Sequence, residues 1–188
     1  LDYKPNEDTT MYFSYSEGAL PGTFNILLNA DGDPLNESQL AEIAQQTGGA
    51  SAEVDEEVSE NIEFGIKKTI LDGRGFIAVA IYDTDLTNVH TPFFSPTYTD
   101  ADGNQALLSG NITSQGGEAS LNGIEIDGTV ILNELWSLDF TYAINDSEIG
   151  NGFQSADTFD LDGDRNKVLG NMFSRYPKNS GSLSANYS

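Results

Sequence analysis

The stretch Glu53–Asn88 constrains the fold of this chain most strongly, because it predicts two long strands joined by one tight turn. From Ile62 onward, apolar and polar side chains alternate, which is typical of a β-strand with one apolar and one polar face. The sequence Leu71-Asp72-Gly73-Arg74 predicts a tight reversal, because Asp-Gly tolerates positive φ. Each limb is longer than the roughly 5 or 6 residues of a strand in a soluble domain, and a strand crossing a bilayer obliquely needs about 9 to 11. This length indicates a membrane barrel.

The rest of the chain supplies more strands, for a total of about seven. They are predicted at Leu1–Lys4, at Thr9–Gly18, in a pair within Ser120–Ile149, and around Lys178–Tyr187. The second strand of the pair has the clearest alternation. Its apolar positions are Trp136, Leu138, Phe140, Tyr142 and Ile144, which oppose Ser137, Asp139, Thr141 and Asn145.

The connections between these strands alternate between short and long. Short turns are predicted near Pro5, Asp72 and Asn133, and long connections at 19–52, 89–111 and 150–173. The first long connection includes a predicted helix at Glu37–Gln46, begun by Asn36 and ended by Gly48-Gly49. An up-and-down barrel in an outer membrane has short periplasmic turns and long external loops, so every second connection is long. The fold class predicted is therefore all-β, an antiparallel up-and-down transmembrane β-barrel.

In such a barrel the apolar side chains face lipid and the polar ones face the interior. The charged residues expected in a wet interior are Glu63, Lys67, Glu125, Asp127 and Asp139. In a dry sandwich core, each would cost several kcal/mol unless paired.

Charge and composition exclude several classes of protein. The 188 residues have 30 acidic and 8 basic side chains, a formal charge of −22, which disfavours nucleic acid and anionic headgroups and favours cationic ligands. The absence of cysteine excludes disulfides, thiolate metal sites and a cysteine nucleophile. No run of about 18 apolar residues predicts a transmembrane helix.

Four stretches resemble the TonB-dependent outer-membrane receptors, and together they cover nearly the whole chain in family order. They are MYFSYSEGALPGTFN from Met11, ENIEFGIKKTILDGRGFIAVAIYDTDLTNV from Glu60, LNGIEIDGTVILNELWSLDFTYAINDSEI from Leu121, and RYPKNSGSLSANYS from Arg175. Each stretch alone is a loose pattern. The resemblance implies a barrel of about 22 strands around an N-terminal plug.

The resemblance also implies a function, namely energised uptake of a scarce nutrient such as a siderophore, vitamin or glycan across the outer membrane of a Gram-negative bacterium. The partners implied are outer-membrane lipid, TonB, and a small-molecule or glycan ligand, but no nucleic acid. We expect residues 1–188 to be a partial barrel domain without the plug, the segment that engages TonB or the closing C-terminal strand. Substrate contacts are expected in 19–52, 89–111 and 150–173.

Each long connection contains oxygen ligands at alternate positions beside a glycine, a pattern that calcium loops use. The richest example is Asp160, Asp162 and Asp164, and two others begin at Asn29 and Asp100. The glycine spacing and the missing bidentate glutamate depart from an EF-hand, and Asp-Gly is common in ordinary turns. Structural turns are the expected interpretation, with no cofactor, and calcium is the alternative.

Nothing in the sequence predicts an enzyme. The single histidine, His90, lies in a predicted Thr- and Pro-rich loop, and no G-x-S-x-G motif or partnered nucleophile accompanies it. Two alternatives to an uptake receptor stay open. The first is a passive porin-like channel, and the second is a soluble secreted β-sandwich that binds a partner.

Overall fold

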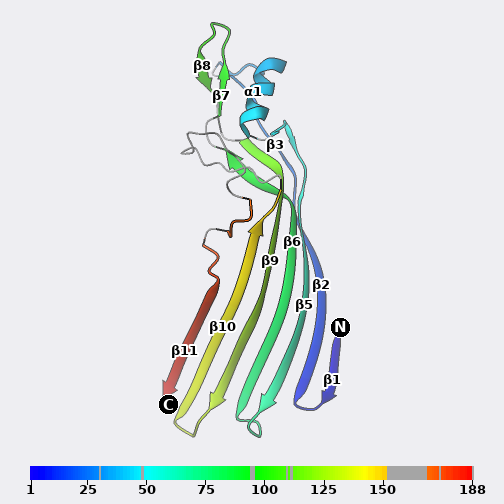
Figure 1. Cartoon of the computed structure of the whole chain (residues 1–188), viewed down its shortest axis with the longest axis vertical. Helices are drawn as coiled ribbons and strands as arrows, with labels where there is room; N and C mark the ends of the chain where they lie inside the picture. The colour runs from blue at the N-terminus through cyan, green and yellow to red at the C-terminus, as the bar shows by residue number, and fades with distance from the viewer. Residues whose placement is uncertain are drawn as a thin grey trace.

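The computed structural model describes the chain except for residues 30, 48, 94–95, 109, 111, 152–168, 174 and 188. One seven-stranded sheet, in the order β1-β2-β5-β6-β9-β10-β11, makes up most of it. Its strands are β1 (Asp2–Asn6), β2 (Thr9–Leu20), β5 (Glu57–Ile70), β6 (Gly75–Phe93), β9 (Ile112–Ile131), β10 (Trp136–Ile149) and β11 (Asn179–Tyr187). All neighbours are antiparallel, and β1 and β11 form opposite edges (Figure 1). The predicted up-and-down order of about seven strands is confirmed.

The three short connections lie at one end of the sheet and the three long ones at the other (Figure 1). In the turn after β5, Leu71, Asp72 and Gly73 have φ angles of 56°, 53° and 88°, as the predicted reversal requires. The first long connection contains β3 (Thr23–Phe24), α1 (Glu37–Thr47) and β4 (Glu53–Val54). The second contains β7 (Thr97–Thr99) and β8 (Gln105–Leu107).

Helix α1 forms where the sequence predicted it. The Asn36 Oδ1 accepts a hydrogen bond from the Gln39 N–H at 3.0 Å, and the Gln39 Oε1 accepts one from the Asn36 N–H at 3.0 Å. This reciprocal pair is a capping box, which satisfies backbone donors at the start of the helix. At the other end, the Gly49 N–H donates to the Ala44 carbonyl at 2.7 Å. No helix in the described part of the chain is both long and apolar enough to cross a membrane.

The sheet has two chemically different faces, because its register aligns the alternation of successive strands. One row across it is Met11, Ile66, Val79, Ile126 and Tyr142. We call this the apolar face, and it also presents the exposed side chains of Phe13, Phe64, Ile81, Ile124 and Ile144. The next residues along the strands define the polar face. No second sheet covers the apolar face within the described residues.

The boundaries of the second long connection differ from the prediction. Strand β6 continues through residues 89–93, so the first five residues of the expected loop 89–111 belong to a paired strand. Strand β9 begins at Ile112, directly after the expected loop. His90 therefore lies in a strand and not in a loop. The Thr- and Pro-rich composition suggested a loop, but Thr91, Pro92 and Phe93 pair with Ser114, Thr113 and Ile112 of β9.

Candidate functional site

The polar face carries every charged residue that the sequence assigned to the barrel interior. Glu63 and Lys67 lie on β5, Glu125 and Asp127 on β9, and Asp139 on β10, all with the parity opposite to the apolar row. Carboxylates outnumber cations in this set by four to one. In a closed barrel the apolar face contacts lipid, so this polar, net acidic face lines the interior.

On β2, next to the β1 edge strand, Tyr12 contacts both Glu63 and Lys67 of β5. Its hydroxyl donates to the Glu63 carboxylate at 2.5 Å, and the Lys67 ammonium lies 5.2 Å from the centroid of its ring. The ring lies across Gly65, where an added Cβ would come within 2.3 Å of ring atoms. Gly65 is therefore needed for the close approach of this ring to the backbone.

A second polar group lies toward the β11 edge. The Asp139 carboxylate accepts hydrogen bonds from the Thr129 hydroxyl at 2.6 Å and from the Asn186 amide at 2.5 Å. The hydroxyls of Thr141 and Ser182 are 2.8 Å apart on the same face. These contacts join the Asp139 carboxylate to neutral donors on both neighbouring strands, β9 and β11.

A third group lies closer to the long connections. The Tyr82 hydroxyl donates to the Asn145 Oδ1 at 2.9 Å and lies 2.5 Å from the Tyr176 hydroxyl. Tyr176 follows the third long connection, and alternation did not identify it because it precedes the last strand. A tyrosine outside a strand gives no periodic pattern from which its contact with the wall could be predicted.

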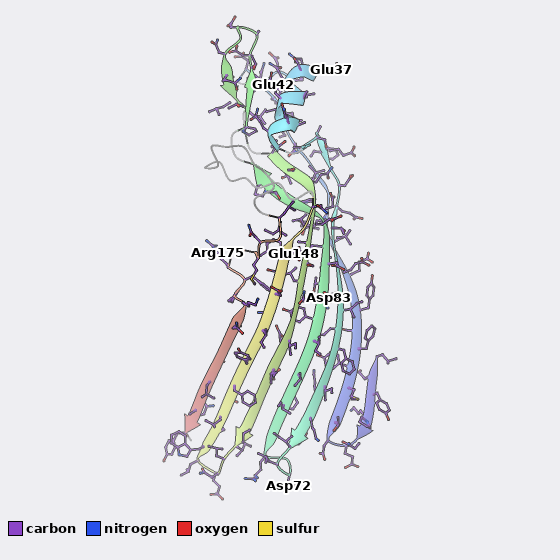
Figure 2. All side chains as sticks on the ribbon, viewed as in Figure 1. Glu37, Glu42, Asp72, Asp83, Glu148 and Arg175 are labelled. Atoms are coloured by element: carbon purple, nitrogen blue, oxygen red, sulfur yellow. The ribbon has the colours of Figure 1, made fainter. Side chains whose placement is uncertain are left out.

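The apolar face changes character abruptly toward the long connections. Beyond Tyr15, Ile62 and Ile81, its next positions are Glu17, Glu60 and Asp83. The Tyr15 hydroxyl donates to the Glu60 carboxylate at 2.7 Å. Figure 2 labels Asp83 at this level and Asp72 at the opposite end of the sheet. This change marks the edge of the part of the wall that contacts hydrocarbon.

The two described sequences with a calcium-like pattern form the same kind of turn. The Asn29 Oδ1 accepts from the N–H groups of Asp31 at 3.0 Å and Asp33 at 2.8 Å. The Asp100 Oδ1 accepts from Asp102 at 2.9 Å and Asn104 at 2.8 Å. In each turn the first side-chain oxygen is already bound to the backbone.

The third such sequence, with Asp160, Asp162 and Asp164, lies outside the described residues, and calcium there stays a prediction. Among the residues that the structure describes, no group of three or more His, Cys, Asp or Glu side chains is arranged to hold a metal ion.

His90 takes part in backbone contacts. Its N–H donates to the Glu57 carboxylate at 2.8 Å, and its Nε2 lies 2.7 Å from the Asp55 carbonyl oxygen. The first contact joins β6 to the start of β5, and the second joins β6 to the segment between β4 and β5. The expected substrate loops are also joined, since α1 of the first connection packs against β7 of the second, with Ile43 and Tyr98 in a shared buried cluster.

The model of the β-barrel of TonB dependent receptor-like proteins matches residues 1–188. The chain belongs to this family. Its members are transport receptors, not enzymes, and they lie in the outer membrane of Gram-negative bacteria, which is therefore the location of this chain.

Individual relatives are distant in sequence but similar in fold. The probable TonB-dependent siderophore receptor PiuA of Acinetobacter baumannii is 21% identical over 187 residues, which are 100% of this chain and 21% of PiuA. The crystal structure of that receptor has a TM-score of 0.59 at 19% identity, with 99% of this chain and 22% of PiuA covered. The ferric yersiniabactin uptake receptor FyuA of Yersinia pestis has a TM-score of 0.60 at 18% identity, with 99% and 22% covered. The chain thus spans about a fifth of the length of these relatives.

Proposed function

We propose that the protein containing this chain is an outer-membrane receptor that takes up a siderophore-type ligand with energy supplied through TonB. Family membership over residues 1–188 carries the proposal. Relatives whose names describe siderophore uptake support this ligand class over a vitamin or a glycan. The described wall fits such a role, because its polar face offers carboxylates, hydroxyls and amides to a hydrated interior.

In this proposal the long connections face the outside and the short turns face the periplasm. Ligand first meets 19–52, 89–111 and 150–173, and then passes along the wall that carries Tyr82, Glu125 and Asp127. Because the described wall is net acidic, it favours ligands that present cationic or hydrogen-bond-donating groups.

The test is uptake by a strain that lacks the gene and is complemented with the full-length protein. Iron-55 complexes of a catecholate and a hydroxamate siderophore are supplied to matched strains with and without TonB. We expect saturable uptake of one complex that disappears without TonB. Uptake that persists without TonB would instead identify the passive channel. If neither iron complex is taken up but the strain grows on cobalamin or a glycan, the proposed ligand class is wrong and the proposed receptor function stands.

A further inference from the structure

The first two long connections and the adjoining ends of β6 and β9 form one folded unit, which we call the head. It comprises β3, α1, β4, β7, β8 and the outer ends of β6 and β9 (Figure 1). Its buried core takes Leu35, Ile43 and Ala50 from the first long connection, and Tyr98, Leu108 and Ile112 from the second connection and the start of β9. Full burial of an Ile side chain contributes about 1.5–3 kcal/mol. Neither connection supplies this core alone.

Polar contacts also join the two connections, and they satisfy the free edge of β7. The Gln46 side chain donates to the Thr97 carbonyl at 2.6 Å and accepts from the Thr97 N–H at 3.0 Å. The Glu42 carboxylate accepts from the Thr99 N–H at 2.7 Å, and the Gln39 amide donates to the Thr99 carbonyl at 3.0 Å. Three side chains on one face of α1 thus pair with β7 much as another strand would. Figure 2 labels Glu42 in the head.

All four chain crossings between the sheet and the head are irregular at one level. Strand β2 ends at Leu20, which pairs with Glu57, the first residue of β5. Pairing of these two chains is interrupted at residues 21–22 and 55–56 and resumes in the same register with Thr23 and Val54 of β3 and β4. In the same region the β6–β9 ladder shifts register twice, between the pairs Leu86–Ala119 and Thr91–Ser114.

The two register shifts compensate one another. One extra residue lies on β6 near Asn88, which has a φ of 58°, and one lies on β9 near Gly116, which has a φ of 96°. Bulges of this kind interrupt the ladder and bend the strand. At the same level, the Asn88 side-chain amide donates to the Glu56 carbonyl at 2.7 Å, a contact between β6 and the residue before β5. We call this level the hinge row.

We propose that the first and second long connections move as one rigid head, which pivots on the sheet at the hinge row. The shared core and the contacts of Gln39, Glu42 and Gln46 hold the two connections together. The interruption of the β2–β5 pairing and the bulges of the β6–β9 pairing lie at the same level, and they concentrate bending at the hinge row. A ligand that displaces one connection therefore displaces the other, and the two do not open independently.

The test measures distances between spin labels in the full-length receptor in lipid vesicles, without any ligand. Residues 1–188 contain no cysteine, and any cysteine elsewhere in the protein is replaced by serine. One label pair, at Glu37→Cys and Asp102→Cys, spans the two connections within the head. The other, at Asp83→Cys and Asp102→Cys, spans the hinge row. We expect a narrow distance distribution for the first pair and a broader one for the second.

The double variant E42A/Q46A should broaden the distribution within the head about twofold, because it removes the contacts with β7. The control E53A removes an exposed carboxylate of the same head and should leave both distributions unchanged. Heat-dependent gel mobility verifies that each variant contains a folded barrel, and the single variants E42A and Q46A should give intermediate widths.

Two results would overturn the proposal. One is a distribution within the head as broad as that across the hinge row, and the other is an unchanged head distribution in E42A/Q46A. Because the measurement uses no ligand, its outcome is independent of the uptake assay.

Discussion

The assignment of the two faces predicts that arginine destabilises the barrel much more at one residue of β10 than at the next. Phe140 lies at the centre of the apolar run Trp136–Ile144 of β10, and the next residue, Thr141, is on the polar face. Arginine at the bilayer midplane of a barrel costs about 2–4 kcal/mol on the lipid face and little in the interior. Phe140→Arg also removes a ring that lies against Gly128, where an added Cβ would be 2.7 Å from a ring atom.

For Thr141→Arg the cost is limited to one contact. The variant loses the hydroxyl pair with Ser182, which is worth about 0.5–1.5 kcal/mol, and its guanidinium faces a wet wall beside Asp127. We expect Phe140→Arg to be less stable than Thr141→Arg by about 2 kcal/mol, or roughly 30-fold in the folding equilibrium.

The assay refolds the full-length receptor and both variants into lipid vesicles across a series of urea concentrations. The folded fraction is the share of protein with heat-modifiable gel mobility. Equal losses in the two variants, or a larger loss for Thr141→Arg, would refute the assignment of Phe140 to lipid. The same vesicles without urea provide the reference for complete folding.

Three further substitutions test local features of the wall and the head. Gly65→Val should destabilise the barrel by about 1–3 kcal/mol, since its side chain would displace the ring of Tyr12; an unchanged urea midpoint would contradict this. Asn36→Ala removes the cap of α1 and should cost about 1 kcal/mol, seen as faster amide exchange in the helix, whereas unchanged exchange would exclude a capping role. Glu42→Ala should speed exchange of the Thr99 amide about tenfold, and exchange at the original rate would show that the carboxylate does not protect it.

The sequence predicted the strands of the sheet well where one face contacts lipid. Lipid requires an apolar residue at every second position, so alternation in Trp136–Ile144 identified both faces of β10 directly. Local chemistry identified the reversal at Asp72-Gly73 and the start of α1 at Asn36 in the same way, because each depends on residues close in sequence. These features need no knowledge of distant contacts.

The head could not be predicted, because its contacts join distant residues. The side chains of Gln39, Glu42 and Gln46 have the polarity of any solvated helix face, and nothing in the sequence shows that they meet Thr97 and Thr99. Each bulge of the hinge row adds one residue to its strand, which interrupts the alternation of apolar and polar side chains. Without this interruption, alternation would have predicted longer strands β6 and β9. Composition therefore suggested a loop where the structure has paired strands.

Strands β6 and β9 are long enough to extend beyond the membrane, so different interactions stabilise the head and the membrane-spanning wall. Strands β6 and β9 have 19 and 20 residues, whereas crossing the hydrocarbon needs about 9 to 11. On β6 the apolar face ends at Ile81, and Asp83 takes the next position on that face. The rest of the strand therefore lies outside the hydrocarbon and forms part of the head. Lipid stabilises the part below this point, and the core and the α1–β7 contacts stabilise the part above it.

The two parts should therefore respond separately to mutation. Glu42→Ala should raise amide exchange in the head and leave heat-modifiable mobility unchanged. Phe140→Arg should lower the folded fraction, and in the molecules that do fold, exchange in the head should equal that of the unmodified receptor. If Phe140→Arg also raised exchange in the head of folded molecules, the two parts would be energetically coupled through the hinge row, and the rigid head would not be an independent unit.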